Sequence, residues 1–295
     1  MVEGAEIVTS ASEPPRGETP AATVPGSTDA DDLWLRRFRP VADPALRLVC
    51  LPHAGGSASA FLPLTRLLPE SVEVLAVQYP GRQDRRLEPF VDTVDALVAH
   101  IVAALPPWLD RPVALFGHSL GSLVAFETAR HLEQQAPEAE VAHLFVSGRV
   151  APTVPLRTTM HLVSDDKLVA RLAELQGTDP RVLADQEVLR LALPAIRNDY
   201  RAADNYTWRP GAPLACPITV LTGSEDPHVP ADGARAWHQL TTGATAFHSF
   251  PGGHFYLTEH AEAVCRTIQT ATGLAAQGSQ LPAPPAVPVR PREFS

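Results

Sequence analysis

The sequence predicts one α/β domain in which helices cover both faces of a mostly parallel sheet. Short apolar runs bounded by Gly or Pro alternate with longer segments of helical periodicity from about Trp34 to about Thr272. No low-complexity linker interrupts this alternation, which favours right-handed crossovers between successive parallel strands. A chain of 295 residues with a hydrophobic fraction of 45% can fill the core of such a domain.

Each element follows from its local pattern. Apolar runs predict buried strands at 46–51, 72–77, 111–116, 143–146, 217–222 and 245–250, and the segment 34–39 is expected to add an edge strand. Helical spacing predicts helices around 58–68, over 91–104, and from Leu120 to the residue before Pro137.

The most informative motif is Gly117-His118-Ser119-Leu120-Gly121, a G-x-S-x-G sequence between a predicted strand and a predicted helix. The glycines allow a sharp turn that exposes the Ser119 hydroxyl at the carboxyl end of the strand. Amides at the start of the following helix point toward that hydroxyl, where they favour an oxyanion. Strand, turn and helix in this order are typical of the nucleophile elbow of the α/β-hydrolase fold. We therefore predict that fold, with Ser119 as the nucleophile.

A serine nucleophile needs a general base and an acid that orients the base, in the chain order Ser, Asp or Glu, His in this fold. Asp226 lies on the loop after one predicted strand, and His254 follows Gly252 and Gly253 after the next strand. Both loops leave the carboxyl ends of strands. They can therefore reach the edge of the sheet at which Ser119 lies, and the three residues form the predicted catalytic triad.

Other residues near these loops have competing interpretations. Glu225 is an alternative orienting acid, and Asp226 is preferred because its shorter side chain is held next to a proline. His118 is expected to pack or to form a local hydrogen bond, since adjacent side chains on a turn point apart. His228 is interpreted as a loop residue, and His248 as a packed or surface residue inside a strand.

The second oxyanion donor is expected on the loop after the strand at 46–51, which reads Pro52-His53-Ala54-Gly55-Gly56. The glycine pair allows close approach of the backbone, so an amide here can face the amide of Leu120 across the substrate carbonyl. Ala54 is the preferred donor and Gly55 is the alternative. The alternative is that the same residues form only a plain turn before the next helix and donate to no oxyanion.

A long insertion separates the strand at 143–146 from the strand at 217–222. Periodicity predicts helices within it at 165–175 and 185–200. The insertion, about 152–213, is too long for a loop and too short for a domain. In an α/β hydrolase an insertion at this place forms a lid that shapes the pocket and excludes water.

The hydrolase domain is expected to span residues 32–273, between two disordered tails. Residues 1–31 and 274–295 are rich in Pro, Ala and polar residues, which do not form a packed core. The sequence contains neither a secretion signal nor an apolar stretch of bilayer length. We therefore expect a cytoplasmic protein that does not bind a membrane.

Charge and cysteine content exclude several classes of partner and cofactor. Cys50, Cys216 and Cys265 lie far apart, which indicates apolar fillers and supports neither a metal site nor a disulfide framework, and we expect no cofactor. The net charge of −9 argues against nucleic acid. Docking to an acidic protein would need a local basic patch. The best candidate is formed by Arg82, Arg85 and Arg86, which can equally be a solvated loop of charges.

With these motifs assembled, the chain resembles the stand-alone type II thioesterases that serve polyketide synthases and nonribosomal peptide synthetases. The resemblance covers roughly residues 33–272 and rests on the motifs Leu51-Pro52-His53-Ala54-Gly55-Gly56, Tyr79-Pro80-Gly81-Arg82, Gly117-His118-Ser119-Leu120-Gly121, Ser147-Gly148-Arg149 with Ala151-Pro152, and Pro251-Gly252-Gly253-His254-Phe255. By this resemblance Ser119, Asp226 and His254 match the family's triad, and Ala54 and Leu120 match its oxyanion amides.

The resemblance implies hydrolysis of acyl thioesters from the phosphopantetheine arm of an acyl or peptidyl carrier protein, which edits stalled or wrongly primed acyl groups. The carrier protein is the implied partner, and we expect a monomer. Three alternatives remain open: a carboxylesterase or lipase acting on small esters, a chain-terminating type I thioesterase, and a non-catalytic binding module on a hydrolase fold.

Overall fold

A seven-stranded sheet with the order β1-β3-β2-β4-β5-β6-β7 forms the centre of the protein, and only its edge strand β1 runs antiparallel to its neighbour. The computed structural model describes residues 33–155, 158–175 and 185–274, so the predicted tails lie outside the described residues except for Leu274. The strands are β1 (Leu35–Arg36), β2 (Leu46–Leu51), β3 (Val72–Val77), β4 (Val113–His118), β5 (Val141–Ser147), β6 (Ile218–Gly223) and β7 (Thr245–Phe250).

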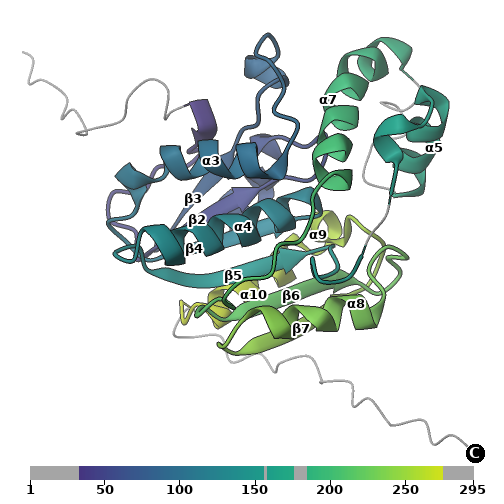
Figure 1. Cartoon of the computed structure of the whole chain (residues 1–295). Helices are drawn as coiled ribbons and strands as arrows, with labels where there is room; N and C mark the ends of the chain where they lie inside the picture. The colour runs from purple at the N-terminus through teal and green to yellow at the C-terminus, as the bar shows by residue number, and fades with distance from the viewer. Residues whose placement is uncertain (1–32, 156–157, 176–184, 275–295) are drawn as a thin grey trace, which may run out of the picture.

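Helices cover both faces of this sheet (Figure 1). One face carries α3 (Val94–Ala104), α4 (Leu120–Gln135) and α8 (Ala231–Arg235), and the other carries α2 (Leu62–Leu67) and α10 (Ala261–Ala271). The remaining α-helices described are α5 (Asp165–Glu174), α7 (Gln186–Asp204) and α9 (Tyr256–Glu259).

The alternation of side chains along the strands divides the core into two layers. In β2, Val49 and Leu51 pack with α3 and α4, whereas Leu48 and Cys50 pack with α2 and α10. Successive side chains of a strand point to opposite faces, and a parallel sheet with helices on both sides buries all of them. This is why the strands read as continuous apolar runs in the sequence.

The structure confirms the predicted strands at 46–51, 72–77 and 245–250 and changes the ends of other elements. The edge strand predicted at 34–39 is reduced to two paired residues in β1. The helix predicted from residue 91 begins at Val94, because the Thr93 side chain accepts a hydrogen bond from the amide of Ala96 and caps the helix. The second helix of the insertion extends to Asp204.

The strand order reverses beside β2. From β2 the chain moves to β3 on one side, and then returns to β4 on the other side and continues outward to β7. Loops that leave neighbouring strands on either side of such a reversal diverge, and the crevice between them is where open α/β sheets bind ligands. In this protein the loops after β2 and β4 carry the predicted oxyanion donor and the predicted nucleophile.

The two glycines of the G-x-S-x-G motif let the loop after β2 and the start of α4 approach each other. A Cβ atom on Gly117 would lie 2.1 Å from the carbonyl oxygen of Gly121, and one on Gly121 would lie 2.0 Å from the carbonyl oxygen of Leu51. Both obstacles are backbone atoms, which cannot rotate away. The motif glycines are therefore required by packing as well as by the turn.

We expect Gly121→Ala to lower the free energy of unfolding by about 3 kcal/mol, because the new methyl group overpacks a rigid backbone contact. The matched control is Gly211→Ala, since a Cβ at Gly211 meets the end of the flexible Arg130 side chain. That change should cost less than about 1 kcal/mol. Urea denaturation of both variants measures the difference, and equal losses would contradict the steric explanation.

Candidate active site

The predicted nucleophile occupies a strained turn between β4 and α4. Ser119 has φ 55° and ψ −114°, a backbone conformation that costs roughly 1–3 kcal/mol for a residue other than glycine. Its amide donates to the carbonyl of Ser147 at 2.8 Å. The hydroxyl of Ser122 bonds to the carbonyls of Gly117 and Ser147, both at 2.9 Å, and ties β4 to β5 beneath the turn.

His254 and Asp226 form a buried hydrogen-bonded pair. His254 Nδ1 lies 2.7 Å from Asp226 Oδ2, and the other carboxylate oxygen accepts from the amide of His228 at 2.9 Å. Burial raises the pKa of Asp226, but the hydrogen bond and charge of His254 outweigh burial and hold this pKa below its usual value. An ionised carboxylate only accepts hydrogen bonds, so Nδ1 carries the proton. Nε2 is then the ring nitrogen left to act as a base.

Glu225, the alternative acid, lies at the surface. Its side chain is exposed, and its amide donates to the carbonyl of Gly252 at 2.9 Å. The geometry therefore favours Asp226 as the residue that orients His254.

His254 lies next to Gly148 and to His118, the residue that precedes Ser119. The rings of His254 and His118 have centroids 5.0 Å apart. A Cβ on Gly148 would lie 2.8 Å from Cε1 of His118 and 3.2 Å from Cε1 of His254. The glycine after β5 thus leaves room for the imidazole beside the residue that precedes Ser119.

His118 is packed, as predicted, and its hydrogen-bond partner lies on the neighbouring strand β5. Its Nδ1 lies 2.9 Å from the hydroxyl of Ser147, which in turn lies 2.6 Å from the hydroxyl of Tyr256. Burial lowers the pKa of His118 well below its usual value, so the ring is neutral. His228 lies in the loop between β6 and α8, as interpreted, and its Nδ1 accepts from the Arg171 side chain of α5 at 2.8 Å. His248 is partly buried on β7.

The loop after β2 meets the start of α4 as the oxyanion prediction requires, and one of its amides already has a partner. Gly55, with φ 77°, donates its amide to Oδ2 of Asp199 at 2.7 Å. Leu120 is the first residue of α4. Because the Gly55 amide is occupied, the geometry favours Ala54 and Leu120 as the pair of oxyanion donors.

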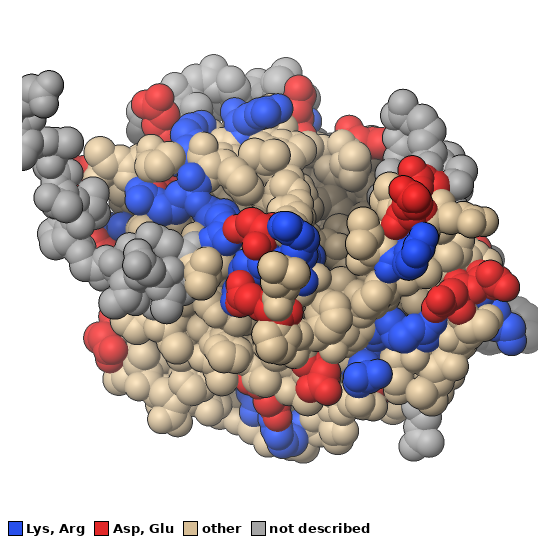
Figure 2. Space-filling model, turned by 90° about the horizontal axis from the view of Figure 1, so that it is seen from above, with Lys and Arg blue, Asp and Glu red and all other residues tan. Residues whose placement is uncertain are grey.

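Two of the three residues of the candidate basic patch are buried, so neither a basic patch nor a solvated loop of charges describes them. Arg82 and Arg85 are only 8% and 5% exposed, and Arg86 alone is exposed. Arg82 pairs with Asp199, and Arg85 pairs with Glu88. A guanidinium group leaves water only where an acceptor compensates for its lost hydration, which a run of charges in a sequence does not reveal. Seen from above, positive and negative side chains are interspersed (Figure 2).

The insertion forms a small helical unit above the sheet. In Figure 1, α5 and α7 lie side by side there. Leu168 and Leu172 of α5 pack against Leu193 of α7 in a cluster separate from the two main core layers. Asn198 of α7 donates to the carbonyl of Val91 at 2.7 Å and anchors the unit to the loop before α3.

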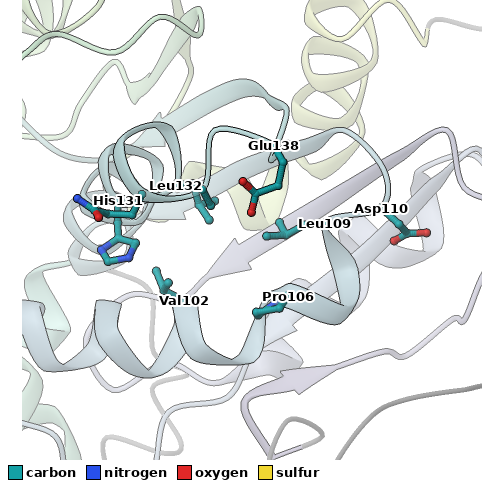
Figure 3. A pocket seen from close by; sticks show the side chains of 9 residues that line it. Val102, Pro106, Leu109, Asp110, His131, Leu132 and Glu138 are labelled. Atoms are coloured by element: carbon teal, nitrogen blue, oxygen red, sulfur yellow. The ribbon is translucent and has the colours of Figure 1, made fainter.

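One cavity borders the candidate site and another lies far from it. A cavity of about 310 Å³ is lined by His53, His118 and Phe255 among others. A second cavity of about 420 Å³ lies where α3 and α4 end, between Pro106 and Glu138 (Figure 3). None of the predicted catalytic residues lines the second cavity, so we assign it no part in the chemistry.

No group of three or more His, Cys, Asp or Glu side chains within 33–155, 158–175 and 185–274 is arranged to hold a metal ion. In the same ranges no helix is both long and apolar enough to cross a bilayer. Cys50, Cys216 and Cys265 are buried free thiols, as predicted for apolar fillers.

Comparisons with known proteins identify the family. The family model described as the thioesterase domain matches residues 46–272. The chain belongs to the thioesterase family. It is an enzyme of the α/β-hydrolase fold that hydrolyses thioesters.

Individual thioesterases are similar over most of their length. PikA5 of Streptomyces venezuelae is 49% identical over 240 residues, which are 80% of this chain and 84% of the relative. A probable cadicidin biosynthesis thioesterase of Streptomyces griseus is 44% identical over 273 residues, 87% of this chain and 75% of the relative. The solved structure of the type II thioesterase BorB from the borrelidin biosynthetic cluster has a TM-score of 0.77 at 47% identity, and covers 82% of this chain and 98% of that chain.

Sequence reasoning missed two sets of residues in the site of this thioesterase. The network of Ser122, Ser147 and Tyr256 has no local signal, because it joins three separate elements. Asp199 had one. It lies three residues from Ile196 and three from Ala202, so it is a charged residue on the buried stripe of its helix.

We expect Asp226→Asn to lower kcat by a factor on the order of 10³ to 10⁴, because the amide imposes the wrong tautomer on His254. Glu225→Gln is the control and should change kcat less than about threefold, since this side chain is exposed. Steady-state hydrolysis of an acyl thioester measures both. An inactive Glu225 variant beside an active Asp226 variant would reverse the assignment.

Proposed function

We propose that this thioesterase is a stand-alone type II enzyme that removes acyl groups from the phosphopantetheine arm of carrier proteins in polyketide or nonribosomal peptide synthesis. The observation that carries the proposal is the buried Asp226–His254 pair, which lies beside the strained turn at Ser119. The chain is similar to the solved type II enzyme BorB, and the similarity covers 98% of the BorB chain. This similarity supports a type II enzyme rather than a terminal synthase domain.

In the proposed mechanism, Ser119, His254 and Asp226 act as the catalytic triad. Nε2 of His254 takes the proton of Ser119 as its hydroxyl oxygen attacks the thioester carbonyl. The amides of Ala54 and Leu120 stabilise the tetrahedral oxyanion, and the positive end of α4 adds to their effect. The carrier thiol leaves with a proton from His254. Water activated by the same ring then hydrolyses the acyl-enzyme.

The helices of the insertion, about 152–213, serve in this proposal as a lid that the carrier contacts. Leu191 of α7 and Leu162 near α5 are 82% and 72% exposed, which gives the lid an apolar surface. The enzyme and a typical carrier domain are both acidic, so apolar contacts rather than general attraction would carry recognition. We propose further that the enzyme is a cytoplasmic monomer and uses neither a nucleic acid nor a membrane as a partner.

The test compares the same acyl group on a carrier protein and on a small aryl ester. We expect kcat/KM for the carrier-bound thioester to exceed that for the aryl ester by at least about tenfold, and to fall only modestly with added salt. A preference for the aryl ester would favour a carboxylesterase. Release of only full-length chains would favour a type I thioesterase.

We expect Ser119→Ala to lower kcat on both substrates by a factor on the order of 10³ or more, because it removes the nucleophile. The change deletes one hydroxyl and should leave the far-ultraviolet circular dichroism spectrum unchanged. Near wild-type hydrolysis by this variant would exclude a serine nucleophile and support a binding role for the fold.

A further inference from the structure

A buried carboxylate of the lid holds the loop on which we place an oxyanion donor. Asp199 of α7 is 1% exposed. Its Oδ2 accepts from the Gly55 amide at 2.7 Å and from Arg82 Nη1 at 2.5 Å, and its Oδ1 accepts from Arg82 Nη2 at 2.8 Å. Each carboxylate oxygen thus has a cationic partner, and one of them also holds a backbone amide.

Arg82 holds the same loop from the other side. Its Nη1 also donates to the carbonyl of Gly56 at 3.1 Å, and its Nε donates to the carbonyl of Pro80 at 3.2 Å. Charge-assisted hydrogen bonds of a bidentate pair fix direction as well as distance. The ion pair therefore determines where the backbone of Gly55 and Gly56 lies.

This arrangement bears on the residue next in sequence. Ala54 shares a peptide bond with Gly55, so a shift of the Gly55 amide moves the amide of Ala54. The side chain of Ile196, also on α7, occupies the space beside Gly55, since a Cβ there would lie 2.4 Å from Ile196 Cγ1. The lid helix thus contacts the oxyanion loop through one charged and one apolar side chain.

We propose that Asp199 is a positioning residue for the oxyanion hole: it places the Ala54 amide by accepting the Gly55 amide while paired with Arg82. This inference rests on the oxyanion assignment of the proposed function but on no particular acyl substrate. The lid then has a part in the chemical step itself, in addition to any contact with a carrier.

The test uses the full-length enzyme and a small aryl ester, so that carrier binding does not enter. Asp199→Ala should lower kcat by about 10²-fold with KM changed less than about threefold, because a misplaced donor weakens the transition state more than the bound ester. Asp199→Asn keeps an acceptor for Gly55 but loses the charge, and should lie between Asp199→Ala and wild type.

The matched control is Asp204→Asn on the same helix. Asp204 has a side chain only 3% exposed and bonds to Nδ1 of His161 at 2.7 Å, a contact within the insertion. Its loss disturbs the lid without touching the loop after β2. We expect kcat on the aryl ester to stay within about twofold of wild type.

A second control exchanges the charges. Arg82→Asp with Asp199→Arg restores opposite charges but presents a cation to the Gly55 amide, which needs an acceptor. We expect no recovery of kcat in this double variant. Full recovery would show that the ion pair alone matters and would overturn the proposed role of the amide bond.

A direct readout is the dissociation constant of an aryl trifluoromethyl ketone, which adds to a serine hydroxyl and places an oxyanion in the hole. Asp199→Ala and Asp199→Asn should both weaken it by about tenfold or more, and Asp204→Asn should not. Wild-type affinity in both Asp199 variants would overturn the inference. If Asp199→Ala does not fold, the dissociation constant measured for Asp199→Asn alone tests the inference. Failure of the carrier-substrate test alone would leave these results unchanged, so the two proposals fail separately.

Discussion

The positive φ of Ser119 is the constraint around which the rest of the site is arranged. A serine adopts this conformation only where its surroundings enforce it, and here they do so from three directions. The backbone of Gly121 packs against the loop after β2, the hydroxyl of Ser122 ties β4 to β5, and the amide of Ser119 is held by Ser147. The strain is thus distributed over the centre of the sheet, where the parallel strands are fully buried.

The position of the site also follows from the order of the strands. Because the chain turns back beside β2, the segments after β2 and β4 lead to helices on opposite faces of the sheet, an arrangement that places ligand sites at this edge of open α/β sheets. The loops after β6 and β7 leave the same edge of the sheet and bring in Asp226 and His254. The sheet supplies these residues from four separate strand ends, and the insertion adds Asp199 from above.

The sequence predicted the parts of the site that have local signals. Ser119 is marked by its glycines and by the change from strand to helix, and Asp226 and His254 by their places after strands. Two features lacked such signals. The ion pair of Arg82 and Asp199 joins residues 117 positions apart, and nothing near Arg82 indicates that its charge is buried. The lid predicted for the insertion carried no indication of the contact between Asp199 and the loop after β2, because that contact exists only after folding.

Two histidines, one partly buried beside the site and one buried near the start of β5, make the stability of the protein depend on pH in mildly acidic solution. Burial, with nearby His254 and Arg82, lowers the pKa of His53 to about 4, and burial lowers that of His143 to about 4 as well. Below about pH 6.5 the unfolded chain binds protons on these rings, whereas the folded chain does so only as the pH approaches 4. The contribution of the neutral rings to the free energy of unfolding is therefore complete above about pH 6.5 and declines as the pH falls toward 4. Unfolding in mildly acidic solution is therefore a proton-uptake reaction, and the stability of the native state has a positive slope with pH in that range.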